Sequence, residues 1–183
     1  MRRLARFVAT FLLLVAGAIP LAGEEPHVSF VPWKVVTPGE VIEAPLTLFW
    51  VPATSEDLRR SGLLTSDALT LFSARCVAMR IIRFDDVERL EALKVEERPM
   101  TVLVDGDGEV LARADATETG EVERIVREAL DASERKADAQ LDEAEQTSDV
   151  ESAKSLYRSV WEQRCVCPRQ AKDAQRALRK LER

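Results

Sequence analysis

The sequence is poor in the residues that most often carry catalysis or hold a small protein together. Its 183 residues include three cysteines, so the chain is no disulfide-dense scaffold and its stability must come from a hydrophobic core. The single histidine, His27, argues against an ordinary Ser-His or Cys-His arrangement. Basic residues are outnumbered by acidic ones, 26 against 32, and the net charge of −6 argues against a nucleic-acid partner, because phosphate binding needs a basic surface.

The three cysteines are Cys76, Cys165 and Cys167, and an odd number leaves at least one thiol unpaired unless two chains pair. Cys76 opens an apolar stretch, where we expect a buried, inert thiol. Cys165 and Cys167 are the candidates for a strained disulfide, a soft metal site or an inter-chain bridge. They would converge only if the helix breaks near Pro168, since residues two apart on a helix point to nearly opposite sides. No third ligand lies nearby in sequence, so structural cysteines are the default and no cofactor is predicted.

Residues 1–23 have the pattern of a secretory signal peptide. Three arginines precede the apolar run FVATFLLLVAGAIPLAG, which ends at the charged EEP. Cleavage is expected after Gly23, with Ala18 as the second choice. An uncleaved membrane anchor is the alternative, but a run of about 17 residues is at the short end for spanning a bilayer. We therefore predict a periplasmic or secreted protein with no membrane contact after cleavage, whose thiols face an oxidising compartment.

The next 108 residues alternate between strand and helix patterns. Prolines make residues 24–43 an extended lead-in, with an edge strand at about 28–36. Residues 44–131 predict the order β-α-β-α-β-β-α, which gives a small mixed sheet covered on both faces. The expected elements are strand 46–51, a helix capped by Thr54 or Ser55, a helix starting at Ser66–Asp67, strand 76–84, helix 85–97, strands 100–104 and 109–114, and helix 119–130.

The segment Asp105-Gly-Asp-Gly-Glu109 joins the last two strands. Its alternating carboxylates suggest calcium, but the remaining ligands of a twelve-residue calcium loop are missing. Two β-rich runs joined by a glycine-bearing turn are a strong hairpin signal. We therefore predict a hairpin turn.

Residues 132–183, the helical extension, show no strand pattern. Three helices are expected from the end of the preceding segment onward, at 131–146, 150–164 and 169–182. The stretch DVESAKSLYRSVWEQRCVCP resembles a degenerate tetratricopeptide unit, with a small residue, a tyrosine four residues later and a downstream proline. Stacked repeats normally need at least three units, so a single unit is expected to serve as a contact surface.

Residues 40–130 resemble the thioredoxin family, in the branch with a longer helix after the active site. LTLFW is similar to the family's central strand with its aromatic pair, Pro99 to its cis-proline, and TVLVDGDGEVLAR to its closing hairpin. The resemblance implies an α/β fold with a thioredoxin-like mixed sheet flanked by helices, to which the small helical extension is added.

The family's redox cysteines are missing from the positions that the resemblance assigns to them. Counting forward from Phe49–Trp50 and backward from Ser66–Asp67 places them on Thr54 and Asp57. The position of the family's buried acid holds Leu48. Because thiol exchange requires a thiolate, we predict that no thioredoxin-type reaction occurs at this site.

These observations predict an exported, non-catalytic thioredoxin-like protein that acts in binding or assembly. A groove lined by Thr54, Asp57, Arg98 and Pro99 would hold an extended peptide or a protein segment through backbone hydrogen bonds. The alternative is a thiol-disulfide oxidoreductase or metal-binding protein that uses Cys165 and Cys167.

Overall fold

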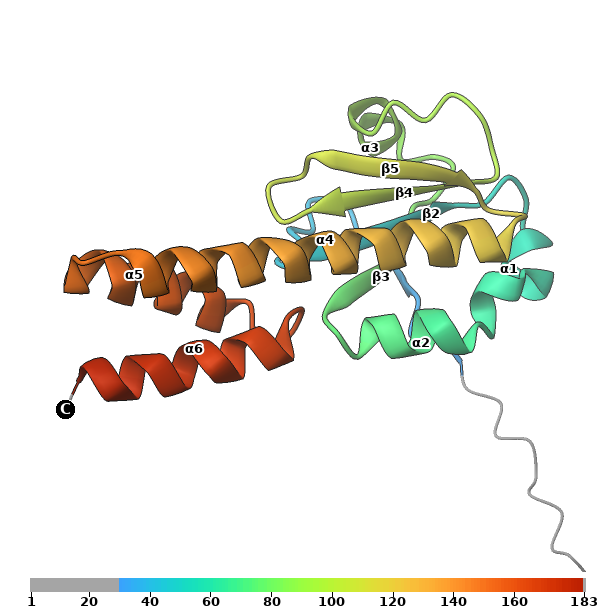
Figure 1. The fold of residues 1–183 in the computed structure, drawn as a ribbon. Helices are drawn as coiled ribbons and strands as arrows, with labels where there is room; N and C mark the ends of the chain where they lie inside the picture. Colours follow the sequence, from blue (N-terminus) through green and yellow to red (C-terminus); the bar gives the residue numbers. More distant parts are fainter. Residues whose placement is uncertain (1–29, 183) are drawn as a thin grey trace, which may run out of the picture.

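The computed structural model describes residues 30–182, so the predicted signal peptide, His27 and the start of the lead-in lie outside the described residues. Five strands form one mixed sheet in the order β1-β3-β2-β4-β5 (Figure 1). β1, β3 and β2 are parallel, whereas β4 runs antiparallel to β2 and β5 antiparallel to β4. The strands are β1 Lys34–Val35, β2 Leu46–Val51, β3 Val77–Ile81, β4 Met100–Asp105 and β5 Val110–Asp115.

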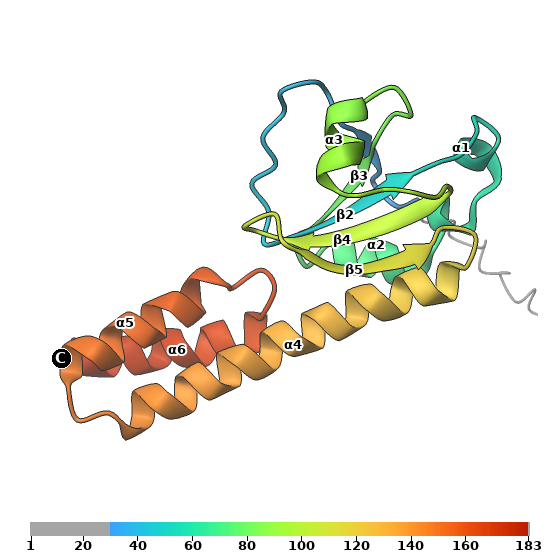
Figure 2. The same ribbon diagram turned by 90° about the horizontal axis from the view of Figure 1, so that it is seen from above.

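Helices cover both faces of the sheet, which confirms the predicted thioredoxin-like α/β fold class. α2 and α4 lie on one face and α3 on the other (Figures 1 and 2). The helices are α1 Asp57–Arg60, the 3-10 turn Gly62–Leu64, α2 Asp67–Ser73, α3 Val87–Ala92, α4 Thr119–Gln146, α5 Val150–Glu162 and α6 Pro168–Leu181. No helix within residues 30–182 is long and apolar enough to cross a membrane.

β2 is the central strand because it pairs with β3 on one side and β4 on the other, and the packed cores on the two faces of the sheet bury it. All six of its residues are buried, as its unbroken apolar sequence predicts. Successive side chains point to opposite faces, so Leu48 and Trp50 belong to the core under α2 and α4. Phe49 and Val51 belong to the core under α3. The strand therefore joins the two cores and fixes where the chain emerges toward Thr54.

Two elements are shorter than the sequence pattern suggests. β3 starts at Val77, after Cys76, and ends at Ile81. α3 is predicted over 85–97 but ends at Ala92, because Lys94 adopts a left-handed backbone with φ of 52°. The predicted hairpin turn is confirmed: the Asp105 carboxylate accepts hydrogen bonds from the Asp107 and Glu109 backbone N–H groups, at 3.0 and 2.8 Å.

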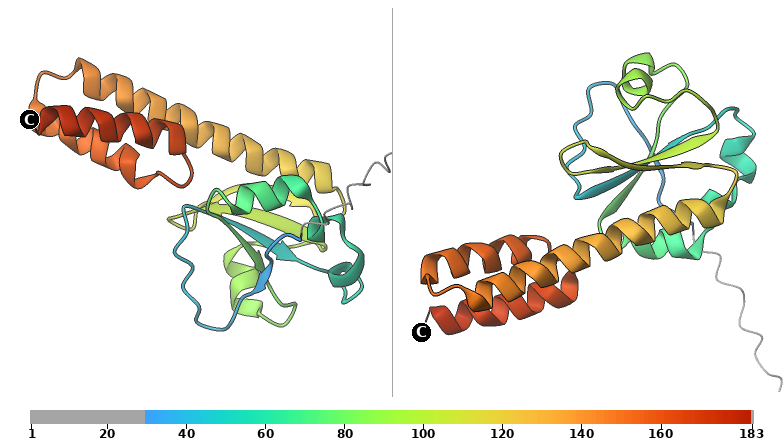
Figure 3. Two further views of the ribbon diagram at one scale, coloured as in Figure 1. Left: turned by 90° about the horizontal axis from the view of Figure 1, so that it is seen from below. Right: turned by 45° about the horizontal axis from the view of Figure 1, so that its top comes forward.

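The prediction of a separate helix starting at residue 131 is wrong. α4 runs through that position as one helix of 28 residues, because no helix breaker interrupts it and Ala137 and Ala144 continue its buried stripe. At 1.5 Å per residue such a helix is about 42 Å long. Its second half therefore projects beyond the sheet, and α5 and α6 pack along it (Figures 2 and 3).

The sheet domain and the helical extension share one continuous core. Leu130 under the sheet is followed along α4 by Ala137, which lies in the same buried cluster as Tyr157 and Val160 of α5 and Ala174 of α6. Alanines at these contacts let the helices approach closely. The extension is therefore packed as part of the fold.

Candidate functional site

The corner that would hold the redox pair in a thioredoxin is closed by a reciprocal polar cap. The Asp57 carboxylate accepts hydrogen bonds from the backbone N–H groups of Ala53 and Thr54, at 2.9 and 2.8 Å. In return, the Thr54 hydroxyl accepts one from the backbone N–H of Asp57 at 3.3 Å. This arrangement satisfies orphan donors at the start of α1. The N-cap of α1 is Glu56, not Thr54 or Ser55 as predicted, and its side chain makes no capping hydrogen bond. Thr54 instead stabilises the turn before α1, and one carboxylate oxygen of Asp57 is committed to this turn.

A hollow of about 250 Å³ lies behind this cap, and its wall includes Trp50, Asp57, Ser61, Pro99 and Thr117. The Arg98–Pro99 peptide bond is cis, as the resemblance implied. The Pro99 carbonyl accepts a hydrogen bond from the Ala116 N–H at 3.4 Å, which ties this segment to the end of β5. The structure therefore brings Asp57 and Pro99 to one hollow.

Arg98 lies on the other side of Pro99, where both residues line a neighbouring hollow of about 290 Å³. Arg98 is exposed, and within residues 30–182 neither its backbone N–H nor its carbonyl makes a hydrogen bond. An unpaired donor and acceptor on one exposed residue can pair with the backbone of an extended peptide. Of the four predicted groove residues, Arg98 carries this capacity and Asp57 lines the adjoining hollow, whereas Thr54 lines neither hollow.

Trp50 is the residue of the corner that the sequence analysis did not assign to the site. It is fully buried, and its indole N–H has no hydrogen-bond partner within the described chain. Trp33 packs against it, with ring centroids 5.4 Å apart, and the Trp33 indole donates to the Leu63 carbonyl at 2.8 Å. The aromatic pair in the sequence marks the strand end, but only the fold shows that Trp50 forms a wall of the hollow.

Gly62 is needed for close packing beside the hollow. A Cβ atom at this position would lie 2.6 Å from the Thr119 hydroxyl, at the start of α4. A larger residue would therefore require the Thr119 side chain to rotate or the 3-10 turn to shift.

Two opposite charges that follow β3, those of Arg83 and Asp85, form an ion pair. Arg83 donates two hydrogen bonds to Asp85, at 2.9 and 2.6 Å, just after β3. These bonds hold the pKa of Asp85 below its ordinary value. Leu48, at the position of the family's buried acid, is fully buried among apolar residues. Positions 54 and 57 hold Thr and Asp, and the position of the family's buried acid is apolar.

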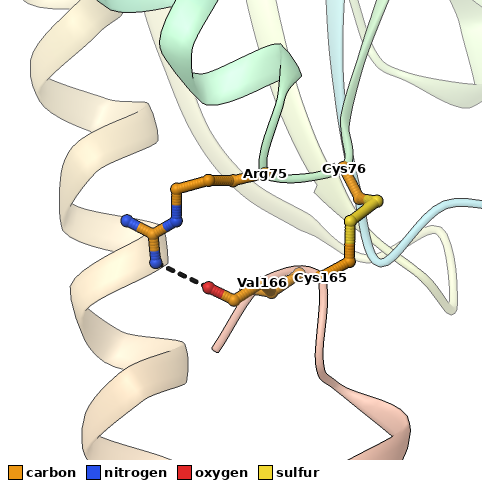
Figure 4. The surroundings of a disulfide bond; sticks show 4 residues. All are labelled: Arg75, Cys76, Cys165 and Val166. Atoms are coloured by element: carbon orange, nitrogen blue, oxygen red, sulfur yellow. Dashed lines mark hydrogen bonds between the residues drawn. A yellow bond between two sulfur atoms is a disulfide. The ribbon is translucent and has the colours of Figure 1, made fainter. Parts of the chain in front are cut away.

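The cysteines pair differently from the sequence prediction. Cys76 forms a disulfide with Cys165, with Cα atoms 5.7 Å apart (Figure 4). Cys76 is exposed at the turn before β3, so the expectation of a buried, inert thiol is wrong. The hypothesis of a redox or metal pair formed by Cys165 and Cys167 is also wrong in its geometry, because Cys165 is already bonded elsewhere. The sequence showed no sign of this pairing, because the two positions are 89 apart along the chain.

The third cysteine, Cys167, is a free thiol that is fully buried in the common core. Burial raises its pKa above the ordinary value, and the nearby carboxylate of Glu134 adds to the rise. A buried thiol of this kind behaves as a small hydrophobic residue. Within residues 30–182, no group of three or more His, Cys, Asp or Glu side chains is placed to hold a metal ion.

Arg75 reinforces the disulfide from the adjacent position. Its guanidinium donates a hydrogen bond to the Val166 carbonyl at 2.6 Å (Figure 4). The same guanidinium forms an ion pair with Glu134 of α4. Arg75 and Cys76 thus hold the loop between α5 and α6 against the sheet domain.

Comparison with known proteins gives no information on activity. No family model matches the chain, and no curated protein matches it. Among solved structures, thioredoxin from Trypanosoma brucei brucei is similar to it at 15% identity and a TM-score of 0.45, over 57% of this chain and 96% of that chain. At that similarity, no activity of the thioredoxin can be transferred to this chain.

Proposed function

We propose that this chain is an exported, non-catalytic thioredoxin-like protein that acts as a binding or assembly module. The observation that carries the proposal is the state of the corner. Thr54 and Asp57 are hydrogen-bonded to each other's backbone, while the backbone of the exposed Arg98, next to Pro99, is unpaired within the described chain. Such a site can bind a peptide but supplies no nucleophile for thiol exchange.

The binding mode follows from the groups that are free. An extended segment laid beside Pro99 would accept a hydrogen bond from the Arg98 N–H and donate one to the Arg98 carbonyl. Backbone hydrogen bonds of this kind provide affinity with little dependence on sequence, while side-chain pockets provide selectivity. The hollow next to Trp50 is the pocket available to one side chain of the bound segment.

The disulfide supports the export part of the proposal. Disulfides form and persist in oxidising compartments and are rare where thiols are kept reduced. The Cys76–Cys165 bond joins two segments of one chain and has an exposed partner in Cys76. A periplasmic or secreted location, with the predicted signal peptide removed, is consistent with that bond.

The helical extension forms the second half of the proposed module. α5 and α6 pack side by side on α4, an arrangement suited to a single tetratricopeptide-like unit (Figure 3). Because this unit shares its core with the sheet domain, a partner bound at the extension would be held in a fixed orientation relative to the corner.

Two measurements on the purified protein test the proposal. In a dithiothreitol-driven insulin reduction assay, the chain should not raise the rate above that of the reductant alone. In an NMR titration, the blocked peptide acetyl-Ala-Ser-Val-Ser-Ala-amide should shift the amide signals of Arg98 and Thr117. The same peptide N-methylated at valine is the control, because it loses one backbone donor. Catalysed insulin reduction, or equal shifts with both peptides, would contradict the proposal.

A further inference from the structure

A second concave site lies where the sheet domain meets the helical extension. This junction groove has a volume of about 540 Å³, within the range of about 300–1,000 Å³ typical of small-ligand sites. Its walls come from four separate parts of the chain and include Leu46, Leu103, Leu111, Ile125, Lys136 and Val166. Leu46 begins β2 and Trp50 lies near its end, so the groove and the corner are at opposite ends of the central strand.

A β-bulge shapes the floor of the junction groove. Leu103 pairs with Ala112, but the next residue, Val104, pairs with Val110. Leu111 is therefore the extra residue of β5 and has no partner on β4. Bulges of this kind re-aim a side chain and often occur beside functional sites. Leu111 is 48% exposed although it is a large aliphatic residue that lines the groove.

The far wall of the junction groove is held in place covalently. Gln163 and Val166 form it, and they belong to the loop between α5 and α6. The Cys76–Cys165 disulfide and the bond from Arg75 to the Val166 carbonyl fix this loop (Figure 4). The groove is therefore preformed, and a ligand does not have to order its wall, which favours binding.

The rims of the junction groove carry opposite charges. On the hairpin rim, Asp107 is exposed, and within residues 30–182 it has no ion-pair partner. Asp105 beside it uses one carboxylate oxygen for the turn. On the α4 rim, Arg124 pairs with Glu128 at 2.9 Å, which leaves Lys136 as the unpaired charge of that rim in the described chain.

We propose that the junction groove binds a short segment of a partner protein in which an aliphatic side chain is followed by a basic one. The aliphatic side chain covers the exposed part of Leu111, and the basic group meets Asp105 and Asp107. Lys136 on the opposite rim disfavours the reversed orientation by like-charge repulsion. This site is independent of the corner beside Pro99, and the two would let the chain hold two segments at once.

The test uses blocked tetrapeptides and NMR titration of the full chain. Acetyl-Ala-Leu-Arg-Ala-amide should shift the amide signals of Leu111, Ala132 and Val166, and leave that of Arg98 unchanged. Replacing the arginine of the peptide with glutamate, or its leucine with alanine, should weaken binding about three- to tenfold. Shifts at Arg98 alone would assign the peptide to the corner and overturn the groove proposal without touching the proposed function.

Variants of the protein give the matched comparison. Asp107→Lys and Leu111→Lys should each weaken the binding of the leucine-arginine peptide about three- to tenfold, while Lys136→Glu should strengthen it. Leu181→Lys is the control, because Leu181 is a similarly exposed leucine at 38% on α6, outside the groove lining. All four sites are exposed, so the variants should fold. The chemical-shift dispersion of the amide signals of each variant checks this.

Two outcomes would overturn the proposal. One is an affinity for the leucine-arginine peptide that changes neither with Asp107→Lys nor with Lys136→Glu, because the charges on the two rims would then play no part in binding. The other is a wild-type dimer in sedimentation equilibrium that Leu111→Lys converts to a monomer, because a second copy of the chain would then occupy the groove.

Discussion

Cys76 and Cys165 are 89 positions apart in the sequence and are joined by a disulfide that connects the turn before β3 to the loop after α5. The closed loop contains β3, α3, β4, β5, α4 and α5. The bond therefore fixes the helical extension to the sheet domain at a second point, in addition to the continuous helix α4.

Removal of this disulfide should lower the free energy of unfolding substantially. Replacing both residues, Cys76→Ser with Cys165→Ser, frees a long loop in the unfolded chain, and the expected loss is about 2–5 kcal/mol. Urea unfolding of the oxidised wild type and of the double variant measures it. The wild type treated with reductant serves as the comparison and should match the variant. Equal unfolding midpoints in all three samples would show that the bond does not form.

Arg75→Met should loosen the loop between α5 and α6 without unfolding the protein. The change removes the hydrogen bond to the Val166 carbonyl and the ion pair with Glu134, both partly exposed to solvent. The expected loss is about 1–2 kcal/mol, with faster hydrogen exchange at the Cys167 amide. Arg127→Met is the control, because Arg127 is exposed on α4 and has no ion pair in the described chain. Equal exchange rates in both variants would contradict a clamping role for Arg75.

Cysteines introduced at the capped corner should react as a pair. Thr54→Cys combined with Asp57→Cys replaces two side chains that already meet each other's backbone at 3.3 and 2.8 Å. We expect the double variant to accelerate dithiothreitol-driven insulin reduction, whereas the wild type does not. Ser55→Cys with Asp57→Cys provides the mismatched spacing and should stay inactive. A double variant no faster than the wild type would show that the corner has lost the geometry for exchange as well as the thiols.

Cys167 should resist alkylation in the folded protein. Burial raises its pKa, so the reactive thiolate is scarce at neutral pH, and the sulfur is also shielded from solvent. Iodoacetamide labelling of Cys167, followed by mass spectrometry, should be at least about a hundredfold slower in the native protein than in urea. After mild reduction, the exposed Cys76 is the internal control and should label much faster. Rapid native labelling of Cys167 would contradict its buried position.

The hydrogen bonds at the start of α5 should stabilise the protein less at low pH than at neutral pH. The Ser152 hydroxyl and backbone N–H donate hydrogen bonds to the Asp149 carboxylate, which lowers the pKa of Asp149 below its ordinary value of 3.8. Because the pKa in the folded state is the lower one, the stabilisation is present above about pH 4 and is lost as the pH falls through the folded value.

Thermal unfolding between about pH 6 and pH 2 tests this expectation. Asp149→Asn keeps a side-chain acceptor without the charge, so its unfolding temperature should fall less steeply in acid than that of the wild type. Asp149→Ala removes the acceptor and should be less stable at every pH. If the unfolding temperatures of the wild type and Asp149→Asn fell equally with decreasing pH, the ionisation of this carboxylate would not be linked to stability.

Much of the sheet domain was predictable because its signals are local. The unbroken apolar run of β2 and the glycine turn at Asp105 act over a few residues, and the structure places both as predicted. Ser66 begins α2 as expected, with its hydroxyl accepting from the Leu69 N–H. The predicted cis peptide at Pro99 is also present, although that expectation came from the family resemblance.

The candidate sites were predictable only in part. The family resemblance pointed to Thr54, Asp57, Arg98 and Pro99, and in the structure Pro99 lines one hollow with Asp57 and a neighbouring hollow with Arg98. The sequence did not identify Trp50 as a wall of the hollow. A strand pattern indicates which face of the sheet a side chain points to, but not which loops cover that face. The junction groove had no sequence signal, because its walls come from four distant segments.

The sequence by itself determined the element types, the caps and the absence of thiols from the corner, because each depends on neighbours within one or two turns or strands. Only the tertiary structure decided the disulfide partner of Cys165, the unbroken path of α4 and the exposed position of Leu111. These depend on how distant segments pack against one another. Local patterns carry no information on which cysteine meets which across 89 positions.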